Sequence, residues 1–345
     1  MGLEHVKAIS EGCAGMALAT VVAVKGSAPR HPGSWMLVGA GSGPLGTVGG
    51  GRGEARALEA CRQSLDQRRS AVLAVEMVGT DIVGPDMVCG GTSTMLIEYL
   101  EDRGPYRTAL ERLAMGQRVL LVKRIHGAEV AVSLLDQDGA PLCGGGAAGP
   151  AALRALADGQ PWFDPEAGIF YDPLFPEEKL LILGGGHVAK ALAALGPGLG
   201  FTVTVVDDRP EMLAADRFPR EVRTIRDGFT PAVAAFPFDC ATYAVIMTRG
   251  HLLDLECVRA VLKRPYRYAG FMGSARKTRL VLDQVLKDGC DPAKVAALCA
   301  PIGLDIDAET PEELAVAVMA ELIAVRRNAG ILPRLAAERE ARRTP

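Results

Sequence analysis

The chain has 345 residues, of which 49% are hydrophobic and 23% charged, with a formal net charge of −3. This is the composition of a folded globular protein, long enough for two domains with separate cores, and it excludes a strongly basic protein, so we expect no binding of nucleic acid. No apolar run reaches the roughly 18 residues that a membrane span needs, and the first residues lack the pattern of a secretory signal. We therefore expect a cytoplasmic protein that does not bind a membrane.

The first half of the chain combines short apolar runs with many turn residues. The runs of strand length are 16–26, 34–40, 70–78, 92–100, 118–127 and 128–136. Helical patterns are few, and the clearest follow residue 51 and span 101–114. We expect a mixed α+β domain over residues 1–176, without an internal repeat of fixed period.

A glycine-rich turn precedes the first of these helices, in the sequence GTVGGGRGEARALEAC (46–61). Successive glycines before a helix can direct several backbone N–H groups at one anion, and nearby arginines can add charged donors. Two interpretations stay open, an anion-binding loop and a plain turn in which Glu54 caps the helix. The candidate binding residues of this half are Arg30, Gly49, Gly50, Gly51, Arg52 and Glu54.

Eight cysteines are spread along the chain without the spacing of a zinc site, so we predict no metal site. Most should be buried thiols, in particular Cys61, Cys257 and Cys299. Cys89 differs, because the two glycines that follow it can direct N–H groups at its sulfur and favour the thiolate. Cys89 is therefore our candidate catalytic residue, and the alternative is a buried thiol at a tight bend.

The second half alternates strand-like runs with helices, which is typical of a mostly parallel sheet with helices on both faces. The strand-like runs are 179–184, 201–207, 221–225, 242–248, 266–273 and 294–301. The helical runs are 187–195, 255–264, 275–289 and one that starts at Thr310. The pattern predicts an α/β, Rossmann-like domain over residues 177–330, followed by a charged C-terminal tail over 331–345.

A strand, a glycine turn and a helix follow one another in LLILGGGHVAKALAAL, as in the nucleotide-binding motif G-x-G-x-x-G/A. An acid that could bind a ribose, Asp207, comes 23 residues after Gly184. Two further loops, MTRGH and GFMGSARKT, follow later strands at the edge where such sheets bind ligands. The candidate binding residues of this half are Gly184, Gly186, His187, Asp207, His251, Gly273, Ser274 and Lys277.

Eight segments, taken in order, resemble the XdhC/CoxI family of accessory factors for molybdenum hydroxylases such as xanthine dehydrogenase. They are GSAPRHPG, GTVGGGRGEA, MVCGGTSTMLIE, LILGGGHVAKAL, VVDDR, MTRGHLLD, GFMGSARKT and PIGLDIDAETPEELAVAVMAELIA. The resemblance covers almost the whole chain, and Arg249 departs from it, because the family often has a histidine there.

The resemblance implies a protein that binds a molybdopterin-type molybdenum cofactor, protects it, helps sulfurate it with a cysteine desulfurase, and delivers it to a hydroxylase. It implies a chaperone rather than a xanthine dehydrogenase, since the chain is short and lacks the cysteine sets of Fe–S clusters. The alternative is an NAD(P)-dependent oxidoreductase, although no recognisable hydride-transfer set follows the strands. The sequence leaves open the client enzyme, the binding of NAD(P) or another nucleotide, and whether the chain forms a homodimer.

Overall fold

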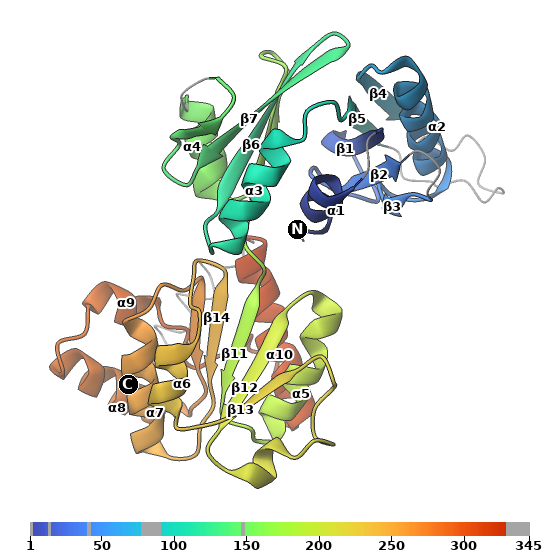
Figure 1. Ribbon diagram of the computed structural model, residues 1–345. Helices are drawn as coiled ribbons and strands as arrows, with labels where there is room; N and C mark the ends of the chain where they lie inside the picture. The colour runs from blue at the N-terminus through green and yellow to red at the C-terminus, as the bar shows by residue number, and fades with distance from the viewer. Residues whose placement is uncertain (1–2, 13–14, 40–42, 77–90, 146–148, 329–345) are drawn as a thin grey trace. The chain divides into compact units, whose positions relative to one another are not determined.

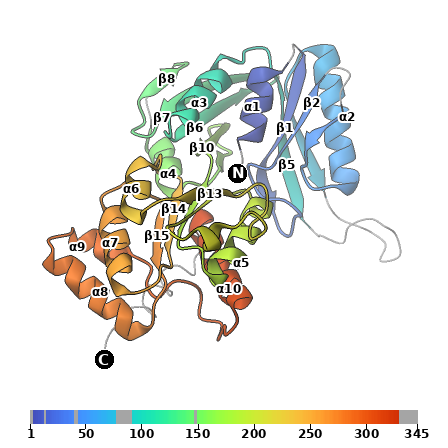
Figure 2. The ribbon, with the colours of Figure 1, turned by 60° about the horizontal axis from the view of Figure 1, so that its bottom comes forward.

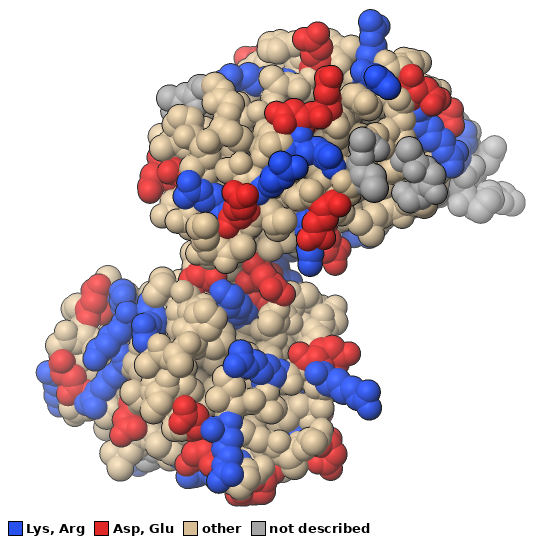
Figure 3. Space-filling model, in the orientation of Figure 1, with Lys and Arg blue, Asp and Glu red and all other residues tan. Residues whose placement is uncertain are grey.

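The computed structural model describes residues 3–12, 15–39, 43–76, 91–145 and 149–328. The chain divides into two compact units, Met1–Pro176 (unit 1) and Glu177–Pro345 (unit 2), which we describe separately (Figure 1). Acidic and basic side chains are interspersed over the displayed face of each unit (Figure 3). Across the described ranges, no helix has the length and apolar character needed to cross a membrane.

Unit 1 contains two antiparallel sheets of five strands each. The strands are β1 (Met16–Lys25), β2 (Trp35–Gly39), β3 (Leu45–Gly46), β4 (Ala71–Glu76), β5 (Thr92–Tyr99), β6 (Val119–His126), β7 (Glu129–Asp136), β8 (Pro141–Cys143), β9 (Trp162–Asp164) and β10 (Ile169–Leu174). The first sheet has the order β3-β2-β1-β5-β4 and the second has the order β8-β7-β6-β10-β9. This is the mixed α+β domain that the sequence predicts for the first half.

The two sheets of unit 1 repeat one arrangement of elements. The helices are α1 (Glu4–Glu11), α2 (Gly51–Gln67), α3 (Gly104–Ala114) and α4 (Pro150–Asp158). In each half, a helix precedes three strands, a second helix follows, and the last strand pairs with the first. The repeat has no fixed period, because α2 has 17 residues and α4 has 9. This uneven spacing explains why the repeat cannot be seen in the sequence.

The core of unit 1 joins both sheets. Helices α1 and α3 lie side by side (Figure 2), and their apolar residues pack with Leu18 of the first sheet and Leu121 of the second. Charged groups are buried here as well: Lys123 donates to Glu98 Oε2 at 2.8 Å, and the Tyr106 hydroxyl donates to the same carboxylate at 3.0 Å. Burial raises the pKa of Asp172, on β10, to about 6.

Unit 2 is a parallel sheet covered by helices. The strands are β11 (Lys179–Leu183), β12 (Thr202–Asp207), β13 (Arg223–Arg226), β14 (Thr242–Ile246) and β15 (Tyr268–Phe271), in the order β13-β12-β11-β14-β15. The helices are α5 (His187–Leu195), α6 (Phe229–Ala235), α7 (His251–Leu262), α8 (Ala275–Lys287), α9 (Pro292–Ala297) and α10 (Pro311–Arg326). Helices α5 and α10 lie on one face of the sheet, and α6, α7 and α8 lie on the other (Figure 1). Successive residues of β11 point to opposite faces, so Leu180 joins the core with α5 and α10, while Leu181 joins the core with α6, α7 and α8. The Rossmann-like fold is thus confirmed.

One predicted strand, 294–301, is wrong over most of its length. The side chain of Asp291 accepts a hydrogen bond from Ala293 N–H and Pro292 follows it, so helix α9 begins here instead. At the end of the predicted strand, Cys299 makes a single parallel bridge to Gly270 of β15. The sequence also did not predict helices α1, α4 and α6.

Candidate functional site

The glycine turn of unit 1 lies between β3 and α2. Gly49 has a φ of 137°, which glycine adopts without strain, and a Cβ built there would come within 2.8 Å of Pro29 Cγ. The same Cβ would lie 3.6 Å from Cγ of Arg30. The structure therefore places the side-chain stem of Arg30 beside the glycine turn, and its role in anion binding stays a prediction. Arg52 is exposed in the first turn of α2.

The carboxylate of Glu54 occupies this turn. Its Oε2 accepts hydrogen bonds from Val48 N–H and Gly50 N–H, each at 3.2 Å, and from the hydroxyl of Thr47. The Thr47 hydroxyl and then these backbone donors hold the pKa of Glu54 below its ordinary value. Of the two interpretations, the geometry gives Glu54 the structural role, and an external anion would have to displace it.

Cys89 lies outside the described residues. Gly91, just after it, packs against the backbone of residues 25–27, because a Cβ built on Gly91 would lie 2.3 Å from Ser27 O. Cys61 and Cys257 are fully buried, as predicted, and burial raises the pKa of Cys61 to about 12. Cys299 is only partly buried, so that prediction holds less well.

The glycine turn of unit 2 follows β11. Gly184 has a φ of 114° and a Cβ there would lie 2.4 Å from Met247 O, so only glycine fits. In contrast, no heavy atom lies within 4 Å of a Cβ built on Gly186. Among the residues that the structure describes, no side chain caps α5, which begins at His187. The turn therefore faces open space in front of a helix N-terminus.

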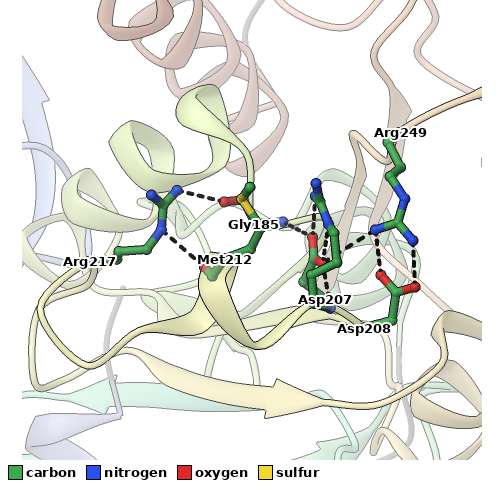
Figure 4. A network of polar contacts seen from close by, with 7 residues as sticks. Gly185, Asp207, Asp208, Met212, Arg217 and Arg249 are labelled. Atoms are coloured by element: carbon green, nitrogen blue, oxygen red, sulfur yellow. Dashed lines mark hydrogen bonds and ion pairs between the residues drawn. The ribbon is translucent and has the colours of Figure 1, made fainter.

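Asp207 holds this turn from the side. Its buried carboxylate accepts from Gly185 N–H at 2.7 Å and from Nε, Nη2 and N–H of Arg209 at 2.9, 3.1 and 3.0 Å. Burial would raise the pKa of Asp207, but the bonds from Arg209 and Gly185 outweigh it and lower the pKa. Both carboxylate oxygens of Asp207 thus accept hydrogen bonds from the protein itself (Figure 4). The sequence suggested that these oxygens could bind a ribose.

Two arginines complete the network in Figure 4. Arg217 donates to Gly185 O at 2.9 Å and to Met212 O at 3.1 Å, which fixes the other side of the turn. Arg249, in the loop after β14, makes a bidentate ion pair with Asp208, in which both N–O distances are 2.8 Å. Sequence reasoning missed Arg217, since a residue 32 positions from its partner carries no local signal.

A third group lies at the ends of β14 and β15. The Lys277 ammonium pairs with Asp254, which is fully buried and also accepts from the Thr248 hydroxyl at 2.6 Å. Ser274, which follows Gly273, caps α8 by accepting from Lys277 N–H at 3.3 Å.

The candidate residues of unit 2 therefore all lie at the carboxyl edge of one sheet. His251 is there too, as the first residue of α7. In the described part of the chain, no three His, Cys, Asp or Glu side chains are arranged to hold a metal ion.

Two family profiles match the chain, one within each unit. The profile of the XdhC Rossmann domain matches residues 180–322, and that of the XdhC and CoxI family matches residues 12–76. The chain is 28% identical to a Bacillus subtilis protein that is named as a probable subunit of xanthine dehydrogenase, over 91% of this chain and 94% of that one. It is 27% identical to the uncharacterized protein YqeB of Escherichia coli over 94% of its own length, but spans only 46% of that protein.

The fold is also found in a solved structure. A crystal structure of a Bacillus halodurans protein, described as a xanthine dehydrogenase, superposes with a TM-score of 0.74 over 94% of this chain and 96% of that one, at 24% identity. This likeness shows the fold alone. The two family profiles, each placed on its own unit, show that this chain belongs to the XdhC and CoxI family.

Proposed function

We propose that this protein is an accessory factor that binds a molybdopterin-type cofactor, protects it and delivers it to a xanthine dehydrogenase-type or aldehyde oxidase-type hydroxylase. Family membership supports a role in the maturation of such an enzyme, as does the similarity to a protein named as part of a xanthine dehydrogenase. The role is supply rather than dehydrogenase chemistry, because the cysteines are not grouped as Fe–S ligands.

The open glycine turn of unit 2 is the observation that carries this proposal. Molybdopterin bears a phosphate, and its dinucleotide forms bear a pyrophosphate. A helix N-terminus with free space in front of it favours such an anion through its N–H groups and its dipole. The backbone N–H groups of Gly186 and His187 would hold the phosphate, since the N–H of Gly184 already donates to Val206 O at 2.8 Å. Ser274 and Lys277, which follow β15 at the same edge of the sheet, would add polar contacts. The cofactor itself supplies the metal centre at which the client hydroxylase works.

Copurification tests the proposal. Protein isolated from cells that make the cofactor should contain molybdopterin, measured by the fluorescence of its oxidised form. Gly186→Val places a side chain in the open space and should lower the bound amount at least about tenfold. Gly198→Val is the matched control, because a Cβ at Gly198 also has no neighbour within 4 Å but lies after α5, away from the turn. Wild-type protein without molybdopterin would contradict the proposal.

The sulfuration step forms a finer part of the proposal, with a cysteine desulfurase as a further partner and Cys89 as the residue involved. Cys89→Ser should leave the unfolding transition unchanged while the delivered cofactor activates the client less well. Full activation of the client by this variant would remove Cys89 from the mechanism.

An NAD(P)-dependent oxidoreductase is the competing function. The carboxylate of Asp207 disfavours it, since both its oxygens already accept hydrogen bonds from Gly185 and Arg209. A titration of NADH fluorescence separates the two functions, and tight binding of NADH without molybdopterin in the purified protein would favour the competitor.

A further inference from the structure

The ion pair between Arg249 and Asp208 crosses the carboxyl end of β11, next to the glycine turn of unit 2. Asp208 follows β12 and Arg249 follows β14, while β11 lies between these two strands in the sheet. A contact between the ends of β12 and β14 therefore has to reach across the carboxyl end of β11, where the glycine turn begins. Both N–O distances are 2.8 Å, and a further distance of 4.0 Å separates Arg249 Nη1 from Asp207 Oδ1 (Figure 4).

This pair differs from the other contacts of the network in its access to water. The side chain of Arg249 is 46% exposed and that of Asp208 is 37% exposed, whereas Asp207 is 1% exposed. An exposed ion pair contributes little to stability, so a ligand can exchange for one partner at small cost. The buried carboxylate of Asp207 accepts hydrogen bonds at both oxygens, so a ligand cannot exchange for one of its partners at small cost.

We propose that Arg249 binds the diphosphate of a nucleotide-type ligand over the glycine turn, and that Asp208 competes with the ligand for this guanidinium. The inference rests on the proposed function, since it takes the same turn as the site. It adds the side chain that contacts the diphosphate, Arg249, and a residue that restrains binding, Asp208. Guanidinium groups bind carboxylates and phosphates with the same planar pair of donors, so one acceptor can replace the other.

The two partners should therefore change affinity in opposite directions. Asp208→Asn releases the guanidinium and should raise the affinity for a diphosphate about three- to tenfold. Arg249→Gln removes the charged donors and should lower that affinity about tenfold. A pair that only stabilises the fold would give losses in both variants.

Calorimetric titration of the full chain with ADP measures these changes. Adenosine, which lacks phosphate, should show no difference between the variants, and inorganic pyrophosphate should follow ADP. Arg259→Gln and Asp288→Asn are matched controls, because Arg259 of α7 and Asp288, the residue after α8, form a comparable ion pair with side chains 36% and 27% exposed. They change the net charge equally and should leave ADP affinity unchanged.

A double variant excludes a general charge effect. If Asp208 acts through Arg249, Asp208→Asn should have no effect in the Arg249→Gln background, whereas a long-range charge effect would persist there. A persistent effect, losses in both single variants, or no ADP binding even by Asp208→Asn would each overturn the inference. Copurified molybdopterin in the wild-type protein tests the proposed function separately, so the two can fail independently.

Discussion

Both units have three successive glycines at the start of a helix, and in both a carboxylate of the protein binds the turn. In unit 1 the carboxylate is Glu54, which belongs to the helix that the turn opens, and it accepts from Val48 and Gly50. In unit 2 it is Asp207, which comes from the neighbouring strand and accepts from Gly185.

The origin of the carboxylate decides what the turn can do. A carboxylate from the first turn of the helix reaches back into the glycines and takes the donors that an anion would use. A carboxylate from the next strand holds the turn from the side and leaves the space at Gly186 open. Two similar sequence patterns therefore give a closed turn, whose N–H groups donate to Glu54, and an open turn, which Asp207 binds from the side. The space around the glycines does not separate them, because a Cβ on Gly50 or Gly51 would also meet no heavy atom within 4 Å.

The largest expected effect concerns the backbone of the open turn. Gly184→Ala should lower the free energy of unfolding of unit 2 by about 3–5 kcal/mol, because the new Cβ would lie 2.4 Å from Met247 O at a φ of 114°. Gly186→Ala, two residues later, should lower it by no more than about 1 kcal/mol, since nothing lies near its Cβ position and the only loss is that alanine is a poorer N-cap than glycine. Urea unfolding followed by circular dichroism measures both, and equal stability of the two variants would break the comparison.

The second-largest expected effect is a difference between the two units in how acid changes their stability. The pKa of Asp172 in unit 1 is raised to about 6, so its contribution to stability is fully present below the unfolded-state pKa near 3.8 and is lost as pH rises through 6. Unit 1 should thus gain up to about 3 kcal/mol between pH 7 and pH 4. Asp207 in unit 2 and Glu54 in unit 1 have pKa values lowered from 3.8 and 4.5, so their contributions are present above these values and are lost on further acidification.

Thermal unfolding from pH 7 to pH 3, with and without Asp172→Asn, tests this pH dependence. The substitution should remove the gain of unit 1 and leave the acid loss of unit 2 in place. A gain that survives in the variant would assign the effect to another group.

The third-largest expected effect is the loss of stability when Glu54 is removed from the closed turn of unit 1. Glu54→Ala leaves Thr47, Val48 and Gly50 without their acceptor and should destabilise unit 1 by about 1–2 kcal/mol. Glu59→Ala on the same helix is the control, because this exposed carboxylate accepts a hydrogen bond from Gln63 of the same helix and does not reach the turn. Binding of inorganic phosphate by the Glu54 variant, measured by calorimetry, would show that the carboxylate alone separates the two turns.

The smallest effect is expected at Arg30. This exposed residue lies beside the closed turn, so Arg30→Ala should change stability by less than about 0.5 kcal/mol and leave molybdopterin retention within twofold of wild type. The amount of molybdopterin that copurifies with the Arg30→Ala variant tests this prediction. A clear loss would show that the first turn contributes to binding in spite of Glu54.

The sequence predicted unit 2 better than unit 1 for a physical reason. Strands covered on both faces are continuous apolar runs, and the helix over 187–195 was predicted with the bounds that the structure gives. Unit 1 repeats a topology with loops and helices of unequal length, which leaves no period to detect. At the site, the glycine positions are local and were predicted, but the pairing of Asp208 with Arg249, 41 residues away, depends on the strand order.

The engaged carboxylate of Asp207 also matters for protein engineering. In nucleotide-binding folds of this type, the acid at the end of the second strand is the natural position for changing cofactor preference. Here a substitution of Asp207 would remove the acceptor of Gly185 N–H and of Arg209. The glycine turn would therefore lose stability before a new specificity could form. A redesign of this domain should therefore leave position 207 untouched and vary the solvent-accessible positions 208 and 249.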